Sequence, residues 1–449
     1  MGRNILSDTS GYQVEIRRTR TKIFVILIVV AFVVPRLGLL VAARGVPLDD
    51  SNWYFFRALS IAHGNGYAFD GTPTAFWPVG YPGFLALLFL VFPAAPTTAL
   101  IANFALSGLA LACSFGIFLK LKIPVSLALF GVMTLAIFPN FIFYQNLLLS
   151  EILMMTMLSI ALLSILSARS SCHFLLSGVA FGFTALVKSQ ILLLPIFVLL
   201  YDVWQSRKLI STIQKYLLVF LGMFVVIFPW TLRNYMIFDR FILVQSDGGY
   251  QLLMGNNKAN PWGGSVGKAS ELVATFPGVV ADIEQRLTDE MNMNDRAAAA
   301  AFHFMTANPV EVLRRVPYKL YRFFRHDPQG IGELLRSNAA AGNPVLWLSS
   351  LFRLSFWYHT IILGLAISSV IVFVIGPIRT RAHFVLLSTI FYSALISAVF
   401  FGEGRFHIPI LPEFVGCMLV TLQAMQAKLR HYFNLRRSPG LVLRKEQRQ

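Results

Sequence analysis

Pro47-Leu48-Asp49-Asp50-Ser51-Asn52-Trp53-Tyr54 follows directly on an apolar run from Ile23 to Ala43. Two adjacent carboxylates at the point where a hydrophobic helix emerges are costly to hold near lipid, and such residues usually have a function. A simpler interpretation is a helix cap, in which Asp50 or Ser51 starts a helix that continues through Arg57. The sequence that follows the pair decides between these two interpretations.

The composition is that of a polytopic membrane protein. The chain has 449 residues, of which 56% are hydrophobic, and its mean hydropathy is +0.65. A soluble chain of this length would show shorter apolar stretches. The run that begins at Ile23 follows a basic segment, as in a signal peptide, but it lacks a small-residue cleavage pattern. We therefore expect an uncleaved membrane anchor.

The net charge of +17 is concentrated in short segments between apolar runs. Of the 38 Lys and Arg residues, 20 lie in six such segments, whereas the hydrophilic stretch 238–345 carries eleven basic and eleven acidic residues. This distribution follows the positive-inside rule. It accounts for the basic composition without a nucleic-acid partner, and we predict none.

Charge placement and run length together predict ten membrane spans with both termini in the cytoplasm. The spans are 23–43, 98–119, 124–142, 149–167, 174–188, 190–204, 216–235, 355–376, 383–401 and 408–426. The apolar segment 81–93 is too short to cross comfortably, so we expect a re-entrant or interfacial helix there, with a full crossing as the alternative. The predicted fold class is an all-α polytopic membrane protein.

The same pattern divides the chain into parts. They are a cytoplasmic N-terminus (1–22), a transmembrane module (23–236) with a first external loop (44–97), an external domain (237–345), C-terminal spans (346–426) and a basic cytoplasmic tail (427–449). The external domain is predicted to be small and mainly helical. Within it, basic and apolar residues interleave over 309–326, which predicts an amphipathic helix on the outer membrane surface.

Short motifs spread over nearly the whole chain carry a resemblance to a known family. They are Asp49-Asp50-x-x-x-Tyr54, His63-Gly64-Asn65-Gly66-Tyr67, Trp77-Pro78-Val79-Gly80-Tyr81-Pro82-Gly83-Phe84, Leu149-Ser150-Glu151, Val187-Lys188-Ser189, Pro229-Trp230-Thr231-Leu232-Arg233-Asn234-Tyr235, Gly255-Asn256-Asn257 and Arg405-Phe406-His407-Ile408-Pro409. In this order and topology the chain resembles the GT-C superfamily of polyprenyl-phosphate-sugar-dependent glycosyltransferases, in its ArnT-like and protein-mannosyltransferase-like branch.

The resemblance implies a GT-C fold with a catalytic first external loop and a small periplasmic domain. It also implies transfer of a sugar from a polyprenyl-phosphate donor to an envelope acceptor, which is lipid A, a polysaccharide or a protein. The reaction would take place on the periplasmic face of the bacterial inner membrane, within the lipid bilayer. Asp49 is the first candidate for the general base and Asp50 the second. Glu151 is the third catalytic candidate: it could support the pair, hold a divalent ion, contact the acceptor, or only stabilise its helix start.

The leaving phosphate of such a donor needs nearby cations. The candidates on the external side are Lys188, Arg233, Arg405 and Arg57, with His407 as a further phosphate or sugar contact. Ordinary snorkelling at helix ends is the alternative for each of them. The sequence shows no metal-ligand cluster, so we predict no metal site, although a divalent cation stays open as a cofactor. The Gly-rich pieces lack a strand-to-helix context, so the sequence gives no support for nucleotide binding.

Three other functions stay open from the sequence. A transporter or flippase of an envelope glycolipid would place its charges near mid-membrane and often shows a repeat, and this sequence has neither feature. A non-catalytic envelope assembly protein would not need an acid pair facing several cations. An O-antigen ligase or polymerase-type enzyme also uses lipid-linked glycans, but the early acid pair argues against it.

The charge distribution generates a testable topology. A reporter fused near Asn292 should lie outside the cytoplasmic membrane and one fused near Gln205 should lie in the cytoplasm, because the basic segments stay on the cytoplasmic side. Protease protection and reporter activity measure both positions. Either reporter on the opposite side would contradict the ten-span topology.

Overall fold

The computed structural model describes residues 4–206, 208–264, 289–376 and 379–437. Three of the predicted segments lie partly outside the described residues. They are the N-terminus 1–22, the external domain 237–345 and the C-terminal tail 427–449. Most of the described residues are helical, which confirms the predicted fold class. The strands among these residues form one short hairpin, β1 (Ala68–Phe69) and β2 (Thr72–Pro73), closed by Asp70 and Gly71, both with positive φ. Asp-Gly is a favoured two-residue turn for a hairpin.

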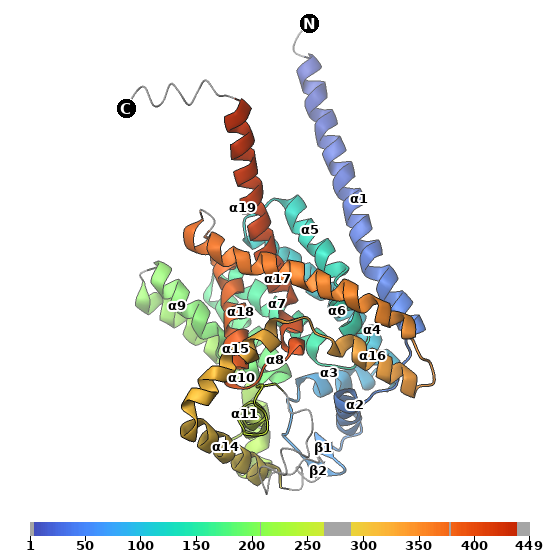
Figure 1. Ribbon diagram of the computed structural model, residues 1–449, viewed down its shortest axis with the longest axis vertical. Helices are drawn as coiled ribbons and strands as arrows, with labels where there is room; N and C mark the ends of the chain where they lie inside the picture. The colour runs from blue at the N-terminus through green and yellow to red at the C-terminus, as the bar shows by residue number, and fades with distance from the viewer. Residues whose placement is uncertain (1–3, 207, 265–288, 377–378, 438–449) are drawn as a thin grey trace.

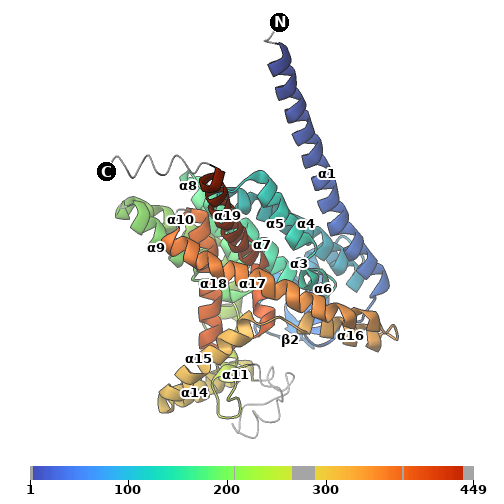
Figure 2. The same cartoon turned by 45° about the horizontal axis from the view of Figure 1, so that its top comes forward.

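The helices follow in this order: α1 (Asn4–Ala42), α2 (Asp49–Ala62), α3 (Gly80–Phe89), α4 (Pro96–Lys120), α5 (Val125–Ala136), α6 (Pro139–Gln145), α7 (Glu151–Ser167), α8 (Ser171–Val187), η1 (Ser189–Ile191), α9 (Leu194–Ser206), α10 (Leu209–Phe238), α11 (Gly248–Gly255), α14 (Glu290–Ala307), α15 (Pro309–Phe324), α16 (Gln329–Ala340), η2 (Leu346–Ser350), α17 (Leu351–Ile375), α18 (Arg381–Val399), η3 (Gly404–Ile410) and α19 (Leu411–Arg437). In Figure 1, α1 and α19 project from one end of the bundle, whereas α11, α14 and the hairpin lie at the other end. Figure 2 shows from a second side that the start of α1 stands clear of the bundle.

Ten helical segments correspond to the ten predicted spans. Within the described residues, seven helices are long and apolar enough to cross a membrane, and the pair α5 and α6, bent by 54°, adds an eighth if it is one span. The remaining two are α7 and α8, which have 17 residues each, the lower limit for a span. α3, which overlaps the apolar segment 81–93, has ten residues and is therefore shorter than a membrane span.

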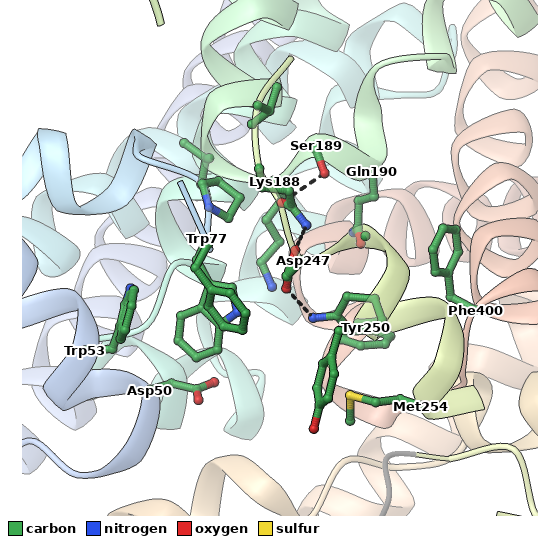
Figure 3. A pocket seen from close by; sticks show the side chains of 18 of the residues that line it. Asp50, Trp53, Trp77, Lys188, Ser189, Gln190, Asp247, Tyr250, Met254 and Phe400 are labelled. Carbon is green, nitrogen blue, oxygen red and sulfur yellow. Dashed lines mark hydrogen bonds between the residues drawn. The ribbon is translucent and has the colours of Figure 1, made fainter. Parts of the chain in front are cut away.

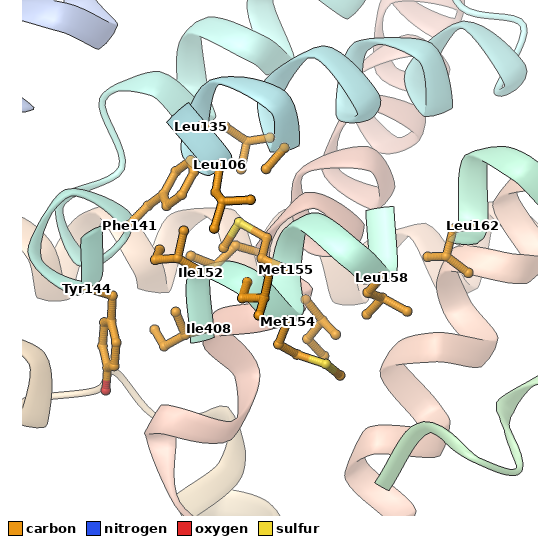
Figure 4. Close-up of a cluster of buried hydrophobic side chains, with 14 of the residues drawn as sticks. Leu106, Leu135, Phe141, Tyr144, Ile152, Met154, Met155, Leu158, Leu162 and Ile408 are labelled. Atoms are coloured by element: carbon orange, nitrogen blue, oxygen red, sulfur yellow. The ribbon is translucent and has the colours of Figure 1, made fainter. Parts of the chain in front are cut away.

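The hydrophobic core is built around α7. This helix is apolar on all sides, and a helix of that kind is stable only when other helices surround it. It packs against α4, α8 and η3, and Ile152, Met154, Met155 and Leu158 are completely buried (Figure 4). Because Glu151 is the first residue of α7, a helix packed in the core fixes its position.

Two glycines allow α8 and α10 to approach closely. A Cβ on Gly178 would lie 2.0 Å from the carbonyl oxygen of Val219, and one on Gly222 would lie 2.3 Å from that of Leu175. Small residues at such positions let membrane helices pack backbone to backbone. This contact fixes the end of α8, where Lys188 lies.

In the external domain, α15 differs from the amphipathic surface helix predicted over 309–326. Two of its basic residues face inward: Arg315 donates to the carbonyl oxygens of Asn257 (2.7 Å) and Asn260 (2.9 Å), and the buried Lys319 donates to Asn256 Oδ1 (2.9 Å). Leu313, in contrast, is exposed. The predicted helix is present, but its inward face combines the basic Arg315 and Lys319 with the completely buried Phe323, because α15 covers both backbone carbonyls of loops and part of the hydrophobic core.

Candidate active site

A cavity of about 1280 Å³ opens at the end of the bundle that carries α11. Five parts of the chain form most of its walls: the start of α2, the loop 69–78, the junction of α8 and η1, the segment 243–254 with α11, and the end of α18 with η3. Figure 3 shows side chains from these parts converging on a common space, with Asp50 and Trp77 facing Lys188 and Asp247. Apart from α2 and the loop 69–78, these parts are far from one another in the sequence.

Glu151 lies at the base of this cavity and is completely buried. Its Oε1 accepts hydrogen bonds from Lys188 Nζ at 2.9 Å and from Arg405 Nε at 2.6 Å. A buried carboxylate is tolerated only when cations and hydrogen bonds offset its desolvation. The three charges therefore require one another, and they join the start of α7, the end of α8 and the segment η3.

Arg405 also reaches the acid pair. Its Nη1 donates to Asp50 Oδ2 at 2.5 Å, so that one guanidinium bridges Asp50 and Glu151. Asp49 and Asp50 form the first turn of α2, where the helix dipole stabilises negative charge, and the N-cap position belongs to Leu48. The two acids are adjacent in the sequence but have different partners, Arg405 for Asp50 and Arg336 for Asp49.

Asp49 points toward the rim of the cavity. Its side chain is 61% exposed and forms an ion pair with the exposed Arg336 of α16, with 3.0 Å between Oδ2 and Nη1. Surface ion pairs of this kind contribute little to stability. Of the two adjacent acids, Asp50 is therefore the one in contact with the cation cluster, through Arg405.

Arg57 lines the cavity through a different type of contact. Its guanidinium lies over the rings of Trp53, at 4.9 Å, and Phe69, at 4.5 Å. Trp53 and Trp77 form an edge-to-face pair next to it, so this wall is aromatic. Burial at this wall lowers the pKa of Arg57. The aromatic faces, with a cation between them, suit the apolar faces of a sugar ring.

Arg233 and His407, which the sequence placed among the phosphate contacts, do not line the cavity. Arg233 donates to the carbonyl oxygens of Thr74 (2.8 Å) and Tyr67 (2.9 Å) and so holds the hairpin in place. His407 is completely buried, its Nδ1 donates a hydrogen bond to the carbonyl oxygen of Phe323 (2.7 Å), and its ring stacks on that of His359 with 4.5 Å between ring centroids. The sequence could place both residues at the external interface but could not give the direction of either side chain.

The structure adds a polar wall that sequence reasoning missed. Asp247 is buried, and its two carboxylate oxygens accept hydrogen bonds from Gln245 Nε2 (2.5 Å) and Gln251 Nε2 (2.7 Å). Gln245 in turn accepts from Ser189, the residue after Lys188, at 3.1 Å. In the sequence this segment carries only a turn signal, Gly248-Gly249-Tyr250. A short polar run with two amides around an acid was the available clue.

A second buried acid ties this wall to the first external loop. Glu290, at the start of α14, accepts from Thr74 Oγ1 (2.7 Å), from the amide of Ala75 (3.0 Å) and from Ser246 Oγ. Burial raises the pKa of Glu290. Glu290 therefore fixes the loop 68–77 against the segment 243–254, and the two are also joined directly, since the amide of Ser246 donates to the carbonyl oxygen of Ala75 at 2.9 Å.

The site residues do not fit a divalent cation. Among the described residues there is no group of three or more His, Cys, Asp or Glu side chains that could hold one. The two central carboxylates, Asp50 and Glu151, are already bound to Arg405, and Glu151 also to Lys188. A metal ion between them would meet two positive charges.

The comparisons with known proteins identify a common fold. No family model and no curated protein matches the chain. Among solved structures, the oligosaccharyltransferase AglB from Archaeoglobus fulgidus, in complex with Zn and sulfate, has a TM-score of 0.52 and 13% identity over 91% of this chain. The same protein in complex with an inhibitory peptide and a dolichol-phosphate has a TM-score of 0.51 and 13% identity over 94%. ArnT from Cupriavidus metallidurans, bound to undecaprenyl phosphate, has a TM-score of 0.43 and 15% identity over 91% of this chain and 78% of its own. This chain spans about half the length of AglB, 49% and 52% in the two structures.

The burial of Asp247 generates a prediction for pH dependence. Burial raises the pKa of Asp247 to about 7, against the two amide hydrogen bonds, which favour the carboxylate. The folded state then keeps a proton that the unfolded state releases near pH 4. The contribution of Asp247 to the free energy of unfolding is therefore fully present below pH 4 and is lost as the pH rises to 7. The free energy of unfolding falls by at most about 1.4 kcal/mol per pH unit in this range.

Asp247→Asn should therefore flatten the stability profile between pH 4 and 7. Thermal unfolding of the purified protein in detergent, measured at several pH values, tests this expectation. The control is Asp295→Asn, which removes an exposed acid at the same end of the molecule. An unchanged pH slope in Asp247→Asn would show that Asp247 is ionised throughout.

Proposed function

Because this chain has the fold of the GT-C glycosyltransferases, as its motifs predicted, we propose that it is an integral-membrane glycosyltransferase. It moves a sugar from a polyprenyl-phosphate donor to an envelope acceptor, which is lipid A, a polysaccharide or a protein. The reaction takes place at the external cavity, on the periplasmic face of the bacterial inner membrane. Both chain ends then lie in the cytoplasm.

One observation carries this proposal: a carboxylate and two cations share the floor of one cavity. Asp50 is in contact with Arg405, and Arg405 and Lys188 are held together by Glu151. Glycosyl transfer from a lipid phosphate needs a proton acceptor on one side of the sugar and positive charge on the other. A transporter needs neither group at the external end.

Asp50 is the proposed general base. It accepts the proton of the acceptor hydroxyl or amine while the acceptor atom forms a bond to the anomeric carbon of the sugar. The bond from that carbon to the phosphate oxygen breaks, and its electron pair leaves with the polyprenyl phosphate. A single displacement of this kind inverts the anomeric carbon and requires no covalent enzyme intermediate.

The sequence ranked Asp49 before Asp50, and the geometry supports the reverse order. Asp49 is paired with Arg336 at the exposed rim, whereas Asp50 faces the cavity next to the cations. Asp49 is proposed to hold α16 near the rim through this pair. The assay below separates the two roles.

Lys188 and Arg405 are the proposed partners of the leaving phosphate. Their charges are held in place by Glu151 before the donor arrives, so that little reorganisation accompanies the reaction. Arg57 lies on the same cavity and is proposed to contact the donor from the aromatic wall. Arg233 and His407 are proposed to support the loop and η3 and to touch neither substrate. No step passes through a metal ion.

The polar wall is proposed to recognise the sugar. Gln245, Asp247 and Gln251 supply acceptors and donors along one side of the cavity, and Trp53 and Trp77 supply aromatic faces on the other. A sugar ring has polar edges and apolar faces, so this pairing matches its shape. The link from Gln245 to Ser189 places the wall next to Lys188, where the phosphate would lie.

Asp50→Asn should reduce transfer by roughly 10²–10⁴-fold, the usual contribution of a general base. Asn keeps the size of Asp and its capacity to accept a hydrogen bond, so membrane insertion should be little affected. The matched variant Asp49→Asn should retain most of the activity, because it breaks only an exposed pair. Transfer from a synthetic polyprenyl-phosphate sugar in liposomes is the measurement, with the sugar identified beforehand from the envelope glycans that a deletion strain lacks.

The reverse order, with Asp49→Asn inactive and Asp50→Asn active, would assign the base to Asp49. Near-normal transfer by both variants would reject a catalytic role for the pair. No loss of any envelope sugar in the deletion strain, together with altered export of a glycolipid, would instead favour a transporter.

Lys188→Gln should reduce transfer by about 10²–10³-fold at limiting donor, as expected for removal of one group that stabilises developing charge. Lys188 suits this test better than Arg405, because removing Arg405 would leave two carboxylates unbalanced and would destabilise the fold. Arg314→Gln, which removes an exposed charge of the external domain, is the control. Full transfer by Lys188→Gln at limiting donor would place Lys188 among the ordinary helix-end lysines.

A further inference from the structure

A second cavity, of about 260 Å³, lies at the other end of the bundle and shares no residue with the first. It is formed where α4 ends, where α9 ends and where α18 begins, on the side of the molecule opposite to α11 and α14 (Figure 1). Four basic residues line it: Lys120, Lys122, Arg379 and Arg381. The proposed reaction uses none of them.

One of the four is already neutralised. Arg381 makes two parallel hydrogen bonds to Asp202, at 2.8 Å and 2.7 Å, and its third nitrogen donates to the carbonyl of Ile165 at 2.9 Å. Tyr216 donates to the same carboxylate at 2.7 Å. Asp202, the one acid that lines this cavity, is therefore fully occupied, and Arg381 forms a fixed part of the wall.

The other three basic residues have no carboxylate partner in the described part of the chain. Lys120 is in the last turn of α4, and Lys122 follows with a left-handed backbone, φ 61°. That conformation is uncommon for lysine and brings two lysines of one loop to the same cavity. Their mutual repulsion would be relieved by an anion.

The cavity also contains the start of α18. Thr380 caps this helix and accepts from the amide of His383 at 3.1 Å, and Thr380, Arg381 and Ala382 all line the cavity. Amide groups and the helix dipole at such a start favour negative charge. Lysine ammonium groups, a guanidinium and a helix start together are the groups that bind phosphate oxygens.

The surroundings place this cavity at the level of lipid headgroups. The three contributing helices are membrane spans, so their ends lie at the boundary of the bilayer. Tyr201 lines the cavity, and the neighbouring Trp204 is 70% exposed. The apolar residues Leu209 and Ile210 at the start of α10 are exposed as well. Aromatic residues of this kind mark the membrane interface, and basic pockets between spans bind lipid headgroups there.

We propose that this second cavity is a phosphate-binding site, whose ligand is the phosphate of an anionic phospholipid headgroup or a soluble phosphate. The positive-inside rule alone explains basic loops on this side, but it does not require two separate loops to close one cavity. Arg169, on the same side of the molecule, does not line the cavity.

The test compares the full-length protein with the double variant Lys120→Gln/Lys122→Gln. The control is Arg20→Gln/Arg169→Gln, which removes the same charge from exposed positions outside the cavity. Native mass spectrometry, after exchange into detergent with phosphatidylglycerol and phosphatidylcholine, measures which lipid stays bound. Thermal unfolding with dihexanoyl phosphatidylglycerol or with inorganic phosphate measures the same site without acyl-chain effects.

We expect the wild type and the control to retain phosphatidylglycerol over phosphatidylcholine. The double variant should bind it about 30-fold more weakly, because each lysine near an anionic headgroup contributes roughly a factor of five. A third outcome is that inorganic phosphate stabilises the wild type but not the double variant, while the wild type does not retain phosphatidylglycerol. That outcome would identify the ligand as a soluble phosphate. Equal behaviour of the double variant and the wild type with both probes, or equal loss in the control, would overturn the proposal.

Discussion

The balance of charge around Glu151 is the interaction on which the external cavity depends. A carboxylate that is completely buried at the start of a core helix must be matched by cations, and Lys188 and Arg405 come from parts of the chain 37 and 254 residues away. Because an unmatched charge there would be very costly, α7, α8 and η3 can pack in only one arrangement at this end. Arg405 then extends the constraint to α2 through Asp50.

This arrangement gives the proposed chemistry its rigidity. The cations that would receive a leaving phosphate are already fixed by a carboxylate that takes no part in proton transfer. The opposite wall is fixed in the same way, since Glu290 joins the hairpin loop to the segment that carries Asp247. Each side of the cavity is thus anchored by one buried acid, and the space between them is left for substrate. At the other end of the bundle the balance differs, since three basic residues around the second cavity have no acid partner among the described residues.

The fold is shared with a much longer protein at very low sequence identity. AglB and this chain are 13% identical, yet the match extends over 91% of this chain. Such a likeness concerns the helix arrangement, which many apolar sequences can adopt, because lipid-facing positions require only apolar side chains of suitable length. What distinguishes one chain from another is the small set of polar residues that each bundle buries. In this chain these are the ion cluster at Glu151 and the amide-flanked Asp247.

The sequence by itself determined the helical membrane class and the positions of the long apolar helices, because the length and composition of an apolar run are local properties of the chain. It also determined that Asp49, Asp50, Glu151, Lys188 and Arg405 lie at one end of the bundle. Only the tertiary structure decided that Arg405 bridges Asp50 and Glu151, that Asp49 turns to the rim, and that Arg233 and His407 point elsewhere. These outcomes depend on side-chain directions and on partners up to 355 residues away, which no local pattern specifies. Asp247 was missed for the same reason, since its burial depends on segments distant in the sequence, among them α14, against which α11 packs.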